Sequence, residues 1–209
     1  MNNIGMKKLL KQVGLVLILT AVYLVVAVPF KVMSVIPGFA DIRPVLMLNP
    51  VYGIFFGIPG CIAFAIGNLI GDLLSDSLRW SSIGGFIANF IGPFLFYVYW
   101  NKISKTPFSL RTGKNLLKQL CVTVVTAVAE TIIITPMVEL SYPEVSGILF
   151  AKTVMLNVSV FPIVLGIPLM ILMQEELHFT PKPFQRKRTH SADISRITPE
   201  IFRTTGPAP

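Results

Sequence analysis

Long apolar runs separated by short polar stretches dominate the chain, and they predict transmembrane helices. The runs cover about residues 13–35, 44–57, 60–74, 80–100, 116–140 and 147–173. They are too long and too continuously apolar for barrel strands, so we expect an all-α integral membrane protein, a six-transmembrane-helix bundle. Runs 44–57 and 60–74 fall short of the roughly 20 residues that a full span needs. These two runs, joined by "GIPG", could instead form a re-entrant hairpin; we favour six spans.

The composition supports a membrane protein and not a soluble one. Of the 209 residues, 53% are hydrophobic and 13% are charged, whereas soluble domains carry about 25% charged residues. The mean hydropathy is +0.71. The first run exceeds a signal-peptide core and no clear cleavage site follows, so we interpret it as a retained helix. We expect a membrane domain over residues 1–176 and a polar, flexible cytoplasmic tail over residues 177–209.

The distribution of basic residues predicts the orientation, because cytoplasmic loops are enriched in Lys and Arg. With both termini cytoplasmic, 14 of the 18 basic residues lie inside: three before the first span, five between residues 102 and 118, and six in the tail. The exceptions are Lys31, Arg43, Arg79 and Lys152. The net charge of +8 therefore reflects topology and requires no nucleic acid. We expect a multi-pass protein of the plasma (cytoplasmic) membrane.

Polar side chains from several predicted spans fall at similar depth, in the outer half of the bilayer. The segment "IGNLIGDLLSD" places Asn68 and Asp72 one helical turn apart beside Gly67 and Gly71. Asn49, Asn89, Glu130, Lys152 and Asn157 lie in the outer parts of other spans. Charges inside a bilayer cost about 2.5–3.5 kcal/mol each on insertion scales and usually mark a functional cavity. We therefore predict a polar pocket that opens to the outside.

The candidate substrate-binding residues are the polar groups of this layer and the charged or aromatic groups at its outer edge: Asp72, Glu130, Asn68, Asn89, Arg43, Arg79, Trp80, Lys152 and Asn157. Basic groups could meet an anion, the acids could accept hydrogen bonds, and Trp80 could stack on a ring. The simpler alternatives are interhelical hydrogen bonds for the asparagines and a structural ion pair between Glu130 and Lys152. Small residues along 63–71 and 85–92 predict two closely packed helices that wall the pocket.

Catalytic signatures are missing from the sequence. It contains no HExxH, GxSxG or Walker A motif, and Cys61 and Cys121 show no paired spacing. We therefore expect no enzyme activity, no metal and no cofactor; an intramembrane enzyme ranks third among the possible functions. Any energy from ATP must come from another protein.

Residues 42–100 resemble the substrate-binding S components of energy-coupling factor (ECF) transporters. The similarity rests on the Arg-Pro entry, the "GIPG" turn, "IGNLIGD", and the Gly/Asn-rich "SSIGGFIANFIGPFLFYVYW". The resemblance implies six helices, cytoplasmic termini, and an outward pocket capped by the loops after the first, third and fifth helices. It also implies a membrane T component and two ATPases, with the S component toppling to carry a vitamin or similar micronutrient inward.

One feature departs from this family. Many S components carry A-x-x-x-A in the first helix, where they dock the T component, but Ala21 and Ala27 are six residues apart here. The leading hypothesis is a substrate-capture subunit for micronutrient uptake. The alternative is a structural scaffold of a cell-envelope complex, similar in size and helix count to the rod-shape-determining membrane protein, with no transported ligand.

Overall fold

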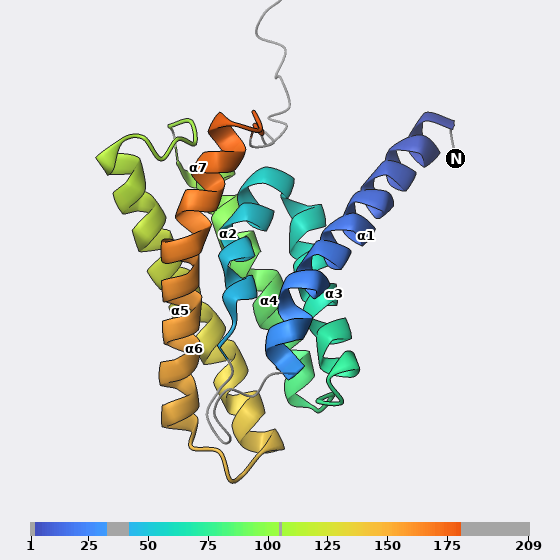
Figure 1. The fold of residues 1–209 in the computed structure, drawn as a ribbon, viewed down its shortest axis with the longest axis vertical. Coiled ribbons are helices and arrows are strands. Elements are labelled where there is room, and N and C mark those ends of the chain that lie inside the picture. The colour runs from blue at the N-terminus through green and yellow to red at the C-terminus, as the bar shows by residue number, and fades with distance from the viewer. Residues whose placement is uncertain (1–2, 33–41, 105, 181–209) are drawn as a thin grey trace, which may run out of the picture.

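Every regular element in the described part of the chain, residues 3–32, 42–104 and 106–180 of this computed structural model, is helical (Figure 1). The elements are α1 (Asn3–Val32), η1 (Pro44–Met47), α2 (Leu48–Val51), η2 (Tyr52–Phe56), α3 (Ile58–Leu74), α4 (Ser81–Val98), η3 (Tyr99–Ile103), α5 (Gly113–Ser141), α6 (Gly147–Phe161), η4 (Pro162–Gly166) and α7 (Ile167–Glu175). η1 is a 3₁₀ turn, whereas η2, η3 and η4 are π-helical. The boundaries agree with the predicted runs to within a few residues, except that α1 begins about ten residues before the predicted start of the first run.

Four helices of the described chain are long and apolar enough to cross a membrane: Gly5–Phe30, Ser81–Ile103, Gly113–Ser141 and Gly147–Glu175. Two further apolar helices, Pro44–Phe56 and Ile58–Leu74, are shorter. The expectation of an all-helical, multi-pass membrane protein is confirmed. The number of spans and the side on which the termini lie stay predictions.

The short segment Pro44–Phe56 lies in the interior of the bundle, where it contacts α4, α3, α1 and η4 (Figure 1). Its residues from Val45 to Phe55 are buried apart from Met47. Because protein surrounds the segment, the backbone N–H and C=O groups of its 3₁₀, α and π turns are not exposed to lipid. It reverses into α3 at Gly57, whose φ of 62° is a left-handed conformation that glycine adopts without strain.

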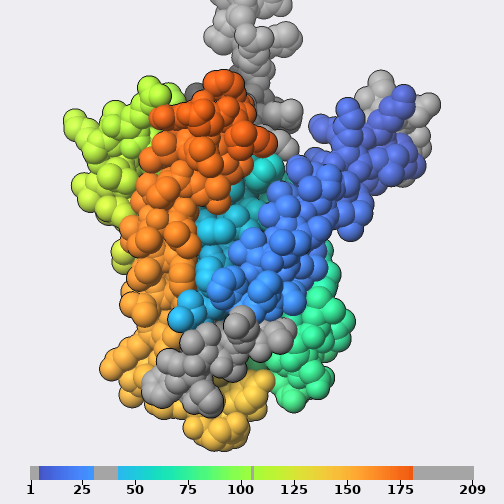
Figure 2. Space-filling model, in the orientation of Figure 1, coloured from blue at the N-terminus to red at the C-terminus, as the bar shows by residue number. Residues whose placement is uncertain are grey.

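The remaining helices follow one another around this segment, with α3 packed between α1 and α4, α4 against α5, and α5 against α6. Close approach of α1 to α3 depends on Gly67, because a Cβ there would lie 2.5 Å from the Tyr23 ring. The N-terminal half of α1 extends away from the bundle, with residues 5–13 exposed (Figures 1 and 2).

Aromatic side chains close the bundle at the end where α7 terminates. Phe108 packs edge-on against Trp100 and Phe55 at centroid distances of 5.0 and 5.7 Å, and Phe179 lies 6.4 Å from Phe55. Trp100 is 5% exposed and donates from Nε1 to Gln119 Oε1 at 2.8 Å. Trp100 therefore belongs to the interior of the bundle. We call Phe55, Trp100, Phe108, Gln119 and Phe179 the aromatic end.

Candidate functional site

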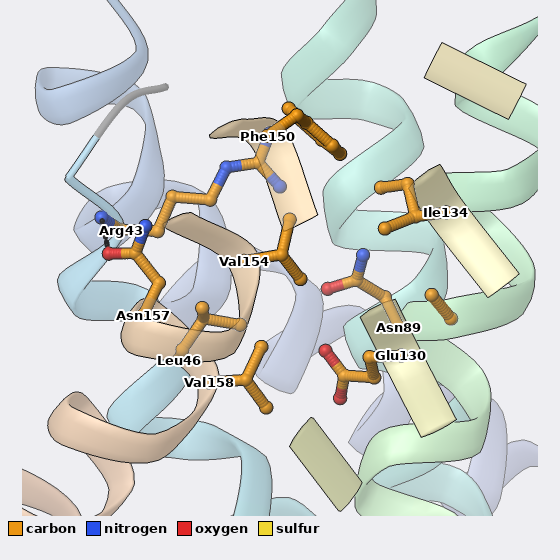
Figure 3. A pocket seen from close by; sticks show the side chains of 10 residues that line it. Arg43, Leu46, Asn89, Glu130, Ile134, Phe150, Val154, Asn157 and Val158 are labelled. Atoms are coloured by element: carbon orange, nitrogen blue, oxygen red, sulfur yellow. Dashed lines mark hydrogen bonds between the residues drawn. The ribbon is translucent and has the colours of Figure 1, made fainter. Parts of the chain in front are cut away.

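A cavity of about 90 Å³ lies between the helices in the other half of the bundle (Figure 3). Its walls come from η1, α4, α5 and α6, and consist of Arg43, Leu46, Ala88, Asn89, Glu130, Ile134, Phe150, Val154, Asn157 and Val158. Four of these residues are polar and all four were candidates from the sequence. A small cavity with apolar walls and a few convergent polar groups is typical of a small-molecule site.

Glu130 is the acidic group of the cavity, and its carboxyl group contacts Asn49 of α2 and lies against Gly92 of α4. The side chain is 3% exposed, and Oε1 accepts a 2.6 Å hydrogen bond from Asn49 Nδ2 of α2. Gly92 of α4 provides the space for this contact: a Cβ there would collide with Glu130 Oε1 and lie 2.7 Å from Asn49 Nδ2. Among the described residues no hydrogen bond is recorded to Oε2, so this oxygen remains available to a ligand.

Asn89 supplies a second acceptor to the same cavity. Its Nδ2 donates to the Gly85 carbonyl oxygen, one turn earlier on α4, at 2.7 Å. That bond sets the orientation of the amide, and Oδ1 is left buried without a partner in the described chain. A buried unpaired acceptor costs about 1–3 kcal/mol, which a ligand or ordered water in the cavity would offset.

Arg43 and Asn157 form the third polar part of the lining. The Arg43 backbone N–H donates to Asn157 Oδ1 at 3.2 Å, which ties the start of η1 to α6. Arg43 is partly exposed, and its side chain extends across the cavity toward Phe150 (Figure 3). The arrangement therefore offers a cationic donor at the accessible edge and acceptors, Asn89 and Glu130, deeper inside.

Asn68 and Asp72 of α3 are buried but do not line this cavity. Asn68 Oδ1 accepts from the Tyr23 hydroxyl of α1 at 3.4 Å, and Asn68 Nδ2 donates to Asp72 Oδ2 at 3.4 Å. A Cβ on Gly85 of α4 would lie 3.0 Å from Asn68 Nδ2. The segment that attracted attention in the sequence thus has the geometry of interhelical hydrogen bonding, and α3 is not a wall of the cavity. A ligand role for these two residues stays a prediction.

Three other candidates lie on the surface. Arg79, Trp80 and Lys152 are exposed, and Trp80 is 78% exposed. The suggested ion pair of Glu130 with Lys152 is not formed, since Glu130 bonds to Asn49 instead. None of the three lines the cavity, and their proposed contacts to a ligand stay predictions.

The sequence placed Asn49 at the right depth without selecting it as a site residue. Its position follows from the central segment, where it is fully buried. An amide in an otherwise apolar run was the available signal, but nothing local indicated Glu130 as its partner, 81 residues away.

In the described chain no group of three His, Cys, Asp or Glu could hold a metal ion. The helices define a multi-pass membrane protein, and the cavity lies among them. Residues 14–175 match the family model described as QueT transporter, and the chain belongs to this family. The searches of curated proteins and of solved structures found no match. The chain is thus a membrane transporter of a small molecule and not an enzyme, as the missing catalytic motifs indicated.

Proposed function

We propose that the chain is the substrate-binding S component of an ECF-type importer, and that it captures a queuosine precursor from outside the cell. It spans the cytoplasmic membrane six times with both termini inside. A T component and two ATPases complete the transporter. The observation that carries the proposal is the cavity in which Arg43, Asn89, Glu130 and Asn157 meet between apolar walls.

The chemistry of the cavity matches a guanine-like ring. Queuosine is built on a 7-deazaguanine, whose pyrimidinone edge carries adjacent N–H and amino donors, as guanine does. Glu130 Oε2 and Asn89 Oδ1 are acceptors that no described residue uses. The carbonyl oxygen of the ring would accept from Arg43 or Asn157. Leu46, Val154 and Phe150 provide the apolar surfaces for the ring faces.

The size of the cavity favours a small ligand. At about 90 Å³ it holds more than a single water molecule but is smaller than the usual 300–1,000 Å³ of drug-sized sites. One bicyclic base is compatible with such a site after modest side-chain movement, whereas a large vitamin is not. This size argument supports a free base as the transported species.

The proposed partners agree with the sequence. It has no nucleotide-binding motif, so in an ATP-driven importer the ATPases would be separate proteins. At the aromatic end the buried rings of Trp100 and Phe108 pack against each other, which would hinder passage of a ligand through that end. Release on the other side therefore requires movement of the whole protein or of its helices, in agreement with the toppling that the ECF resemblance implies. Membership of a transporter family disfavours the scaffold alternative.

The test is calorimetric titration of the purified protein in detergent with 7-deazaguanine and its 7-aminomethyl derivative. We expect saturable binding by wild type and a loss of about 10- to 100-fold in affinity for Glu130→Gln, because the amide oxygen would stay with Asn49 Nδ2 and the amide NH2 group would face the donors of the ligand. Glu139→Gln is the matched control: the same substitution on α5 at an exposed residue, with affinity unchanged. Wild type that binds neither base would contradict the proposal.

The partner proposal has its own test. Affinity purification of the chain from its native membrane should recover two ATPases and one further membrane subunit. Recovery of cell-wall synthesis proteins without ATPases would support the scaffold function instead.

A further inference from the structure

Three helices converge on the Glu130 carboxyl group, which needs no ligand to be held in place. Asn49 donates from α2, Gly92 on α4 leaves the space, and Glu130 itself extends from α5. Asn49 is 0% exposed and does not line the cavity, so it touches Glu130 and not the ligand. Its Nδ2 occupies Oε1, which leaves Oε2 as the oxygen that the ligand can use.

We propose that Asn49 is a positioning residue and Gly92 its steric counterpart, and that together they set the selectivity of the cavity for ligands with an amino donor. The proposal rests on the proposed function for the identity of the ligand. A carboxyl group held at one oxygen cannot rotate to bind whichever atom a ligand presents. Selectivity against a ligand without the amino group therefore depends on the restraint as well as on Glu130.

The restraint predicts how selectivity changes when it is removed. In wild type, replacing 7-deazaguanine by 7-deazahypoxanthine, which lacks the exocyclic amine, leaves a fixed acceptor unpaired and weakens binding about 10- to 100-fold. In Asn49→Leu the carboxyl group turns to a new partner or to water, so the same replacement costs about fivefold or less. A residue that only stabilises the fold would weaken both ligands equally and leave this ratio unchanged.

The first experiment needs no ligand. The apparent Tm is measured for wild type, Asn49→Leu, Glu130→Met and the double variant, and the proposal requires the two single effects to be non-additive, since either substitution alone removes the hydrogen bond. The same cycle in the Gly92→Ala background should show the coupling reduced, because the added methyl group separates the two head groups. Gly84→Ala is the control on α4, since its Cβ meets the Met137 side chain and not the cavity; there the coupling should persist.

The second experiment titrates the two bases into wild type and Asn49→Leu. Additive Tm effects in the first experiment would overturn the positioning role, whatever the ligand. Non-additive effects with an unchanged ratio of affinities would overturn the selectivity role. Wild type that binds neither base would overturn the proposed function and, with it, the selectivity role, while the ligand-free coupling would still decide whether Asn49 positions Glu130. Asn49→Leu carries the test if Gly92→Ala does not fold.

Discussion

The two ends of the bundle use polar side chains in different ways. At the aromatic end, Trp100 Nε1 donates to Gln119 Oε1 at 2.8 Å and packed rings fill the surrounding space, so that Gln119 Nε2 is a buried donor without a partner in the described chain. In the cavity half, Asn89 Oδ1 is buried and unpaired, and Glu130 has one oxygen committed to Asn49. Polar groups enclosed by packed rings maintain the fold, whereas unpaired acceptors that line a cavity can be used by a ligand. The comparison predicts that substitutions at the aromatic end change the stability of the protein, whereas substitutions in the cavity half change its affinity for the ligand.

The largest expected effect is on stability, at the aromatic end. Trp100→Ala removes a buried ring that packs on Phe108 and leaves Gln119 Oε1 without its donor. We expect a loss of about 3–5 kcal/mol in the free energy of unfolding. Thermal unfolding in detergent, followed by circular dichroism, measures it. Affinity of the surviving folded fraction should be unchanged; a matching loss of affinity would remove the distinction between the two ends.

In the cavity half, the expected effect is on affinity. Arg43→Gln retains the backbone bond to Asn157 but removes the cationic donor, so binding of 7-deazaguanine should weaken about 10-fold. The apparent Tm of the unliganded protein should change little. Lys152→Gln is the comparison variant, because it removes an exposed cation that does not line the cavity. Equal losses in both variants would point to a general charge effect and against a contact from Arg43.

A third substitution tests the contact between α1 and α3. Gly67→Ala places a methyl group against the Tyr23 ring and should destabilise the protein by about 1–3 kcal/mol. Affinity should be unchanged, because neither residue lines the cavity. Gly14→Ala, where a Cβ meets nothing within 4 Å, should be neutral. If Gly67→Ala instead weakens binding at constant Tm, the Asn68 and Asp72 cluster belongs to the site after all.

The smallest expected effect comes from the exposed ion pair at the end of α7. Arg111 Nε lies 2.7 Å from Glu175 Oε1, and this hydrogen bond raises the pKa of Arg111 above its ordinary value. The guanidinium group is therefore charged at every accessible pH. Exposed pairs contribute little, so Arg111→Gln should leave the apparent Tm and the affinity unchanged within error. A clear decrease in Tm would show that the loop before α5 depends on this contact.

The membrane class and the helix positions could be predicted from the sequence because hydrophobic runs report directly on burial in lipid. The depth argument similarly selected Asn89, Glu130 and Asn157, and the search for a cation at the outer edge added Arg43; all four line the cavity. The same argument could not separate them from Arg79 and Lys152, because depth says nothing about the direction in which a side chain points around its helix. Nor could it show that Asn68 lies against Tyr23 of α1 and Gly85 of α4 and does not line the cavity.

The sequence by itself determined the environment of each segment. Apolar runs form the helices that lie in lipid or in the core, and most basic residues lie in the segments between or beyond these runs. What only the tertiary structure decided is which polar groups meet. Asn49 and Glu130 are 81 residues apart, and their contact exists because Gly92 lets α2, α4 and α5 approach closely. Hydropathy is a local property of a segment, whereas a binding site depends on the rotation and register of several helices, which only their mutual packing fixes.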